Sequence, residues 1–183
     1  PNQSDTISMN LHIDALNNLK LIKHLERAPA EHKGNAGKVV LIGGAPGMAG
    51  ALLLAGNACL HLGAGWTILE MLDPASACAD VSQPELMIRL ATPEVCEVLS
   101  SLQADVIAIG PGLGKSALAS QYLKEALASK NIPLVIDADA LNLISDSAGL
   151  LASLKQRNAD FPGLTVLTPV SYTHLRAHET PEH

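Results

Sequence analysis

The chain has 183 residues, which is enough for one domain with a substantial core. Apolar residues make up 48% of it, yet it holds only one Trp, two Tyr and one Phe, so the core must be built from aliphatic side chains. The formal net charge of −6 and the lack of a basic cluster argue against nucleic acid or an anionic membrane as the main partner.

The cysteines and the start of the chain bear on its compartment. Cys59, Cys78 and Cys96 are widely spaced with no Cys-x-x-Cys pair, which favours free thiols over disulfides or a zinc site. No basic and apolar leader is present, so we expect a cytoplasmic protein. The uncharged stretch 39–69 has the length of a membrane span, but glycines and Pro46 interrupt it, which favours a buried soluble helix.

Residues 1–30 are predicted to form an N-terminal extension that contains one short helix. Asp14 is placed to cap this helix. Its apolar side chains recur at helical spacing and are Leu16, Leu19, Ile22 and Leu25.

A strand, a glycine loop and a helix are predicted between Lys38 and Leu62. The β-branched run 39–42 leads into glycine-rich residues 43–50, and the segment after them is apolar on both sides, so we expect its helix to be largely buried. Glycines let main-chain N–H groups approach a ligand closely, and the start of a helix adds partial positive charge. This loop therefore predicts binding of a phosphate or a nucleotide.

Five further strands alternate with helices along the rest of the chain. The predicted strands span residues 66–71, 85–90, 105–109, 133–136 and 165–167. Helices are predicted from Pro93 to Leu99, after a cap at Ser116, and from Ala140 onward. This alternation predicts an α/β fold with a parallel sheet that is covered on both faces.

Three polar or glycine-rich features directly follow predicted strands. They are the loop 43–50, the loop 110–116, and the pair Asp137 and Asp139. Because ligands bind at the carboxyl edge of an open α/β sheet, we expect these features to converge on one crevice.

The first loop invites comparison with dinucleotide-binding loops. Glu70 lies about twenty residues after Gly50, which is the distance at which such proteins place a ribose-binding acid. The spacing here is Gly44-x-x-Gly47-x-x-Gly50, however, and Pro46 removes one amide donor. An oxidoreductase with a variant dinucleotide loop is therefore an alternative hypothesis.

The second loop ends like a P-loop, with Gly114-Lys115-Ser116 between a strand and a helix. A P-loop requires a glycine five positions before Gly114, where Ile109 stands, so the phosphate cradle would have the wrong size. A tight turn that leads from strand to helix explains the same residues.

Asp137 and Asp139 alternate along a segment predicted to be extended, so we expect their side chains to point to opposite sides. One would face the crevice and hold a hydroxyl or a hydrated Mg²⁺, and the other would cap the next helix.

Six motifs occur in the order found in one enzyme family. They are His32-Lys33-Gly34, Gly43-Gly44-x-x-Gly47-Met48-x-Gly50-Ala51, Gly63-Ala64-Gly65, Pro84-Glu85-Leu86-Met87, Gly110-Pro111-Gly112-Leu113-Gly114 and Asp137-Ala138-Asp139-Ala140-Leu141-Asn142. Over residues 31–169 the chain thus resembles the ADP/ATP-dependent NAD(P)H-hydrate dehydratases, the carbohydrate-kinase-like domain of the YjeF type. No single motif is decisive, but their order and their positions after strands make the resemblance specific.

The resemblance implies a ribokinase-like, three-layer α/β fold with a mainly parallel central sheet. It also implies a repair reaction on the S epimer of hydrated NADH or NADPH, called NAD(P)HX. The family phosphorylates the added hydroxyl from ADP or ATP with Mg²⁺, and then eliminates phosphate to restore the cofactor. By analogy, Gly50, Ala51 and residues 112–114 line the dinucleotide site. The family also implies a fused or separate NAD(P)HX epimerase as a partner, and whether such a domain precedes Pro1 is left open, as is the choice between ADP and ATP.

The chain departs from the family after Thr168-Pro169. The family continues with a His and a Gly-Glu, whereas Val170-Ser171-Tyr172 stand here, and the Gly-x-Gly-Asp motif that carries the catalytic Asp does not occur. Residues 170–183 look like a translated sequencing adaptor, that is, a non-native tail. We therefore expect a partial domain over 31–169, incomplete at its C-terminus, inactive, and with an unpaired sheet edge that favours a homo-oligomer.

These observations give a set of candidate substrate-binding residues and no catalytic or metal-binding ones. The candidates are Gly47, Met48, Gly50, Ala51, Gly112, Leu113, Gly114, Asp137 and Asp139. The alternatives to a repair enzyme are the variant oxidoreductase and a non-catalytic structural domain.

Overall fold

The structure is a computed structural model that describes residues 36–169. The predicted helix after Asp14 and the predicted tail 170–183 lie outside the described residues.

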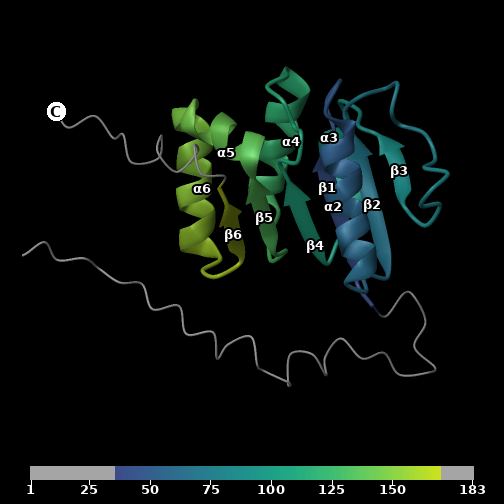
Figure 1. Cartoon of the computed structure of the whole chain (residues 1–183). Coiled ribbons are helices and arrows are strands. Elements are labelled where there is room, and N and C mark those ends of the chain that lie inside the picture. The colour runs from purple at the N-terminus through teal and green to yellow at the C-terminus, as the bar shows by residue number, and fades with distance from the viewer. Residues whose placement is uncertain (1–35, 170–183) are drawn as a thin grey trace, which may run out of the picture. The chain divides into compact units, whose positions relative to one another are not determined.

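Six parallel strands form one sheet in the order β3-β2-β1-β4-β5-β6. They are β1 (Lys38–Gly43), β2 (Trp66–Met71), β3 (Met87–Leu90), β4 (Val106–Ile109), β5 (Leu134–Asp137) and β6 (Thr165–Thr168). Figure 1 shows β3 and β6 at the two ends of the sheet. All six predicted strands are present, and the predicted parallel α/β architecture is confirmed.

Five helices connect the strands in the described part of the chain. They are α2 (Ala49–His61), α3 (Val95–Leu102), α4 (Ala117–Ala128), α5 (Ala138–Ser145) and α6 (Ala148–Asp160). The Ser116 hydroxyl caps α4 as predicted, because it accepts the Ala119 N–H at 3.0 Å. The single helix predicted from Ala140 is two helices, since Ser147 accepts the Leu150 N–H at 3.3 Å and starts α6 as a new helix.

The helices cover the sheet on both faces and so make three layers. On one face, Leu41, Leu69 and Met71 pack with Leu52 of α2. On the other face, the odd–even alternation of the strands turns Ile42, Ile107 and Ile136 toward α4 and α5. This second face holds the larger part of the core, which includes the fully buried Tyr122.

The expectation that α2 is largely buried is wrong. Only Leu52 and Gly56 are buried in this helix, and Leu54 is 73% exposed. The helix forms an outer layer on β1 and β2, so only one stripe of it can reach the sheet. Its lack of charge therefore does not indicate burial on all sides.

Candidate functional site

The two glycine loops lie where the strand order of the sheet reverses. β1 has β2 on one side and β4 on the other, so the chain moves outward in one direction after β1 and in the opposite direction after β4. In open α/β sheets the crevice at this switch point, beyond the carboxyl ends of the strands, is where ligands bind. The loop after β1 and the loop after β4 both begin there.

Main-chain hydrogen bonds join the two loops directly. The Gly44 N–H donates to the Pro111 carbonyl at 3.0 Å, and the Ala45 N–H donates to the Gly112 carbonyl at 2.7 Å. The expected convergence of the two loops is therefore observed, and it results from contact between their backbones.

This close contact explains why Gly110 and Gly112 are glycines. A Cβ on Gly112 would lie 2.6 Å from the Met48 carbonyl oxygen, and its φ is +58°. A Cβ on Gly110 would lie 2.0 Å from the Asp137 carbonyl oxygen, and its φ is +135°. Packing within the protein accounts for both residues without any ligand.

Gly47 and Gly50 differ, because a Cβ added to either would meet no atom of the described residues within 4 Å. The φ of +80° at Gly47 explains that residue as part of a turn. Gly50 lies in the first turn of α2, where glycine costs roughly 0.5–1 kcal/mol relative to alanine. Neither backbone strain nor an atom of the described residues requires glycine there, so the main chain of Gly50 borders open space.

The other predicted residues of the two loops differ in how exposed their side chains are. The side chains of Met48 and Ala51 are exposed beside Gly50 at the start of α2. Leu113 is 0% exposed and packs in the core, so only its main chain is left to face a ligand.

Each of the two aspartates accepts a hydrogen bond near the carboxyl ends of the strands through one oxygen. Asp137 Oδ1 accepts a hydrogen bond from the Thr168 hydroxyl at 2.9 Å, and Asp139 Oδ2 accepts the Gly114 N–H at 3.0 Å. Asp137 occupies the N-cap position of α5, but its side chain makes no capping hydrogen bond, so the predicted helix cap is wrong. The alternation argument fails because α5 begins at Ala138, whose φ of +34° ends the extended conformation.

Glu70 does not belong to the crevice. It is 0% exposed and faces α4, where the Tyr122 hydroxyl donates to its Oε2 at 3.3 Å and Arg89 Nε lies 3.5 Å from its Oε1. Burial raises the pKa of Glu70, and Arg89 and the Tyr122 hydrogen bond oppose this rise. Burial and the Glu70 charge raise the pKa of Tyr122 to about 12. A carboxylate in this position cannot reach a ribose, which removes the feature that favoured a dinucleotide-binding oxidoreductase.

Lys115 makes an exposed ion pair with Asp146, with 2.8 Å between Nζ and Oδ2. Its ammonium group thus contacts the end of α5, and Ser116 caps α4. Both side chains thus make contacts that stabilise the turn from β4 into α4, which favours the turn interpretation over a P-loop.

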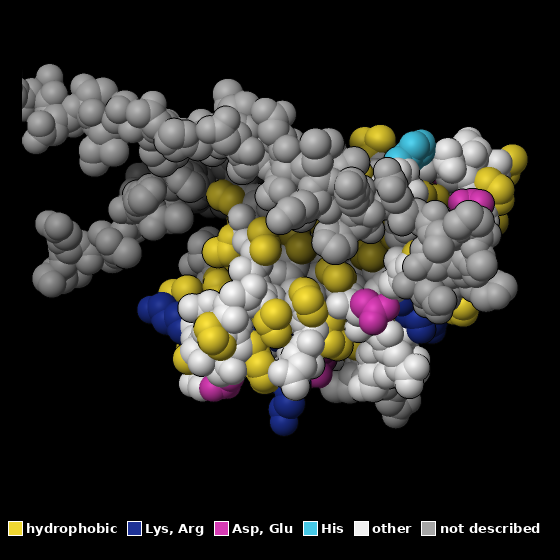
Figure 2. All heavy atoms as spheres, turned by 90° about the horizontal axis from the view of Figure 1, so that it is seen from below, with side chains coloured by type: hydrophobic (Ala, Val, Ile, Leu, Met, Phe, Trp, Pro, Cys, Tyr) yellow, Lys and Arg dark blue, Asp and Glu magenta, His cyan; other side chains and the backbone are white. Residues whose placement is uncertain are grey.

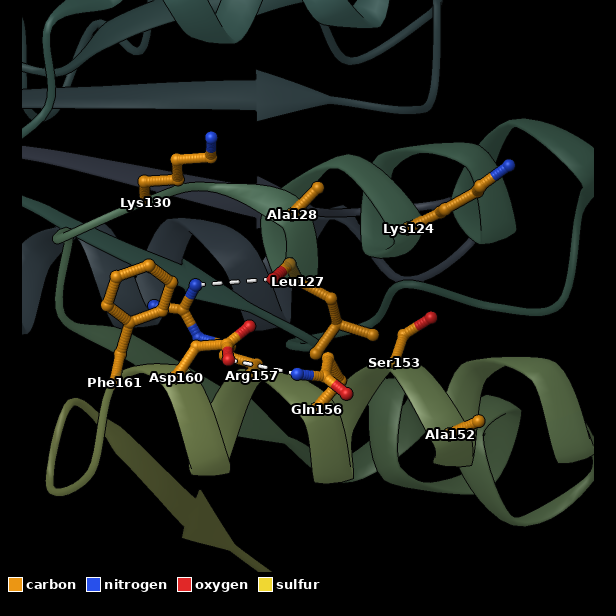
Figure 3. Close-up of a pocket in the computed structure, with 10 residues that line it drawn as sticks. All are labelled: Lys124, Leu127, Ala128, Lys130, Ala152, Ser153, Gln156, Arg157, Asp160 and Phe161. Carbon is orange, nitrogen blue, oxygen red and sulfur yellow. Dashed lines mark hydrogen bonds between the residues drawn. The ribbon is translucent and has the colours of Figure 1, made fainter.

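A groove of about 720 Å³ lies between α4 and α6, and none of its lining residues belongs to the glycine loops. In Figure 3 the Arg157 side chain reaches across the groove to α4, while the Lys124 and Lys130 side chains extend away from it. The guanidinium donates to the carbonyls of Leu127, Ser129 and Ile132, and burial lowers the Arg157 pKa. Arg157 therefore links α6 to the end of α4 through hydrogen bonds. This role could not be predicted from the sequence.

Figure 2 shows hydrophobic side chains between scattered charged ones on one face of the described part. Within residues 36–169 no helix is long and apolar enough to cross a membrane. Nor do three or more His, Cys, Asp or Glu side chains in that range gather into a metal-binding group.

Known proteins are similar to this chain in both sequence and fold. The chain is 38% identical over 130 residues to a bifunctional NAD(P)H-hydrate repair enzyme from Leishmania braziliensis, covering 66% of this chain and 23% of that protein. It is 36% identical over 129 residues to the ADP-dependent (S)-NAD(P)H-hydrate dehydratase of Lactiplantibacillus plantarum, covering 68% and 45%. A ribokinase-like superfamily protein from Enterococcus faecalis V583 has a similar structure, with a TM-score of 0.67, 33% identity, and coverage of 85% of this chain and 53% of that one.

The chain thus spans between about a quarter and about half of the length of these relatives. The family model described as NAD(P)H-hydrate dehydratase matches residues 39–176, a range that contains both glycine loops and the aspartate pair. The chain belongs to the NAD(P)H-hydrate dehydratase family.

Proposed function

We propose that this chain provides the substrate-binding wall of a dehydratase that repairs the S epimer of hydrated NADH or NADPH. The observation that carries the proposal is the open main chain at Gly50, beside the joined loops at the switch point of the sheet. A dinucleotide needs such a place, because its pyrophosphate must come close to backbone N–H groups and to the start of a helix.

The chemistry of the family reaction explains what such a wall must achieve. The added hydroxyl is a poor leaving group until it loses its proton and its oxygen attacks the terminal phosphorus of ADP or ATP. This attack breaks the bridging P–O bond, releases AMP or ADP and leaves a phosphate ester on the ring. Loss of phosphate, together with a proton from the neighbouring ring carbon, then restores the ring double bond of NADH. The residues that hold the dinucleotide fix the position of the hydroxyl for this attack.

Each part of the crevice has a role in this proposal. Main-chain groups at Gly47, Gly50 and residues 112–114 bind the dinucleotide, and Met48 and Ala51 contact it at the start of α2. Asp137 and Asp139 each keep one carboxylate oxygen that accepts no hydrogen bond from residues 36–169, which suits a substrate hydroxyl or a hydrated Mg²⁺. When bound, Mg²⁺ offsets the charge of the phosphates.

We further propose that the 183-residue chain binds the hydrated dinucleotide without converting it. The resemblance assigns the catalytic aspartate to a Gly-x-Gly-Asp motif, and this motif does not occur in the sequence. A fused or separate epimerase would be the natural companion of such an enzyme.

Thermal denaturation with two ligands tests the proposal. The S epimer of hydrated NADH should raise the melting temperature of the 183-residue chain, whereas intact NAD should not. A shift with NAD as large as that with hydrated NADH would favour an oxidoreductase, and no shift with either would favour a structural domain. Incubation with hydrated NADH and ADP should produce no NADH absorbance, and turnover would show that the catalytic aspartate has been assigned wrongly.

A further inference from the structure

The groove between α4 and α6 has the size and the lining of a small-molecule site. Its volume of about 720 Å³ lies within the range of roughly 300–1,000 Å³ that is usual for ligand pockets. Its apolar lining comes from Leu127 and Ala128 at the end of α4, from Ala152 of α6, and from Phe161 directly after α6. Because Ala128 and Ala152 are exposed and small, a flat ring has room between the two helices.

The charges of the groove are mostly positive, although the chain as a whole has a formal net charge of −6. Lys124, Lys130 and Arg157 contribute three cations to the lining. Among the described residues that line the groove, the one acid is Asp160, so the formal charge of the lining is +2. Asp160 Oδ1 already accepts a hydrogen bond from the Gln156 amide at 2.9 Å. The groove therefore favours an anion, and a dianion would balance its charge.

Arg157 brings a buried hydrogen-bond donor to this groove. The residue is 2% exposed, and a guanidinium has five N–H groups. Four of them donate to the Thr165 hydroxyl and to the carbonyls of Leu127, Ser129 and Ile132. The fifth has no acceptor among residues 36–169, and burying an N–H group without an acceptor is costly. An anionic oxygen in the groove would supply the missing acceptor.

We propose that the groove between α4 and α6 binds a small aromatic phosphate monoester. Such a group carries roughly −1.5 to −2 charges at pH 7 and three strong acceptor oxygens, which match the charge of the groove and the fifth N–H group of Arg157. The aromatic ring lies between Ala128 and Ala152 and against Phe161, whose ring centre is 5.9 Å from Arg157 Cζ.

The two lysines complete this site from the side of α4. Figure 3 shows the Lys124 and Lys130 side chains extending outward near the groove. A lysine binds phosphate as a point charge on a flexible stem, so both ammonium groups can turn toward a phosphate in the groove. None of the lining residues belongs to the glycine loops or to the aspartate pair, so this site does not depend on the proposed function.

Isothermal titration of the full 183-residue chain with 1-naphthyl phosphate tests this proposal. The probe combines a flat aromatic body with a phosphate and contains no ribose or nicotinamide. 1-Naphthol supplies the rings alone, and inorganic phosphate supplies the anion alone. Each should bind at least about tenfold more weakly than 1-naphthyl phosphate, because each makes only part of the contacts.

Two variants show whether the probe binds in the groove. Replacing both lysines, with Lys124→Gln and Lys130→Gln, should weaken binding about tenfold or more. Ala152→Trp fills the groove without changing its charge and should weaken binding by a similar factor. The control is Lys155→Gln, which removes a charge from the exposed side of α6 outside the groove and should change the affinity less than about twofold. Circular dichroism checks that each variant folds.

Three results would overturn the proposal. The first is that 1-naphthyl phosphate does not bind to the folded chain. The second is that 1-naphthol or inorganic phosphate binds as tightly as the ester, because the groove would then not recognise the combination of ring and phosphate. The third is that either groove variant keeps the affinity of the unaltered chain, because the probe would then bind elsewhere.

Discussion

The main-chain N–H of Gly114 donates a hydrogen bond to Asp139 Oδ2 at 3.0 Å, and this bond joins the second glycine loop to helix α5. The loop follows β4, whereas Asp139 follows β5, so the bond joins the ends of two neighbouring strands beside the switch point. It gives Asp139 a structural task in addition to any contact with substrate.

Asp139→Ala should lower the free energy of unfolding by about 1–3 kcal/mol, because it leaves a half-buried N–H without its charged acceptor. Asp139→Asn keeps an oxygen acceptor, so its free energy of unfolding should fall by less than that of Asp139→Ala. Urea unfolding measures both, with Asp160→Ala as the control, since this exposed residue should change stability by only about 0.5 kcal/mol. Equal losses for all three variants would show that the Gly114 bond contributes nothing.

Gly112→Ala should destabilise the protein by about 2–3 kcal/mol, since the methyl group meets the Met48 carbonyl and the residue has a positive φ. The control is Gly163→Ala, where φ is +80° but nothing lies within 4 Å of the added carbon. That variant should cost about 1–2 kcal/mol from backbone strain alone. The difference between the two unfolding free energies measures the contact between the loops, and no difference would contradict it.

The buried Glu70 should make stability depend on pH. Burial raises its pKa in the folded protein, so the folded state binds more protons than the unfolded state between the two pKa values. The stabilisation is therefore complete at acid pH and is lost as the pH rises through the folded pKa. Glu70→Gln should be more stable than the unaltered chain at about pH 8 and lose this advantage toward about pH 4. A constant difference in unfolding free energy across this range would refute the assignment.

Arg157→Met should lower the free energy of unfolding by about 2–4 kcal/mol. The substitution removes the donor for three main-chain carbonyls at the end of α4 and leaves them without this hydrogen-bond partner. Lys155→Met, on the exposed side of the same helix, is the matched control and should stay within about 0.5 kcal/mol of the unaltered chain. Chemical denaturation gives both values, and a small effect at Arg157 would mean that water replaces its hydrogen bonds.

The strands of the sheet could be predicted from the sequence, because short aliphatic or β-branched runs, several of them followed by glycine or aspartate, are a local signal. The helix cap at Ser116 could also be predicted, because capping depends on residues only three positions apart. The resemblance to a family then led to the proposed function, because the irregular glycine spacing of the first loop did not identify its ligand.

Contacts between distant residues could not be read from local patterns. The exposure of Leu54 depends on what α2 packs against, and the role of Arg157 depends on carbonyls about 30 residues away. Asp137 and Asp139 were placed by an alternation rule that holds only in a strand, and α5 begins between them. The reasons for Gly112 and Gly50 also differ only in three dimensions, since one touches Met48 and the other faces open space.

The central claim, that the open main chain at Gly50 belongs to the dinucleotide site, is tested most directly by Gly50→Ala. The added methyl group meets no atom of residues 36–169 within 4 Å, and the substitution removes a helical glycine, so stability should stay equal or rise by about 0.5–1 kcal/mol. Isothermal titration with the S epimer of hydrated NADH should nevertheless show at least about tenfold weaker binding than for the unaltered chain, a loss of about 1.4 kcal/mol. Unchanged affinity in a stably folded Gly50→Ala variant would contradict the claim.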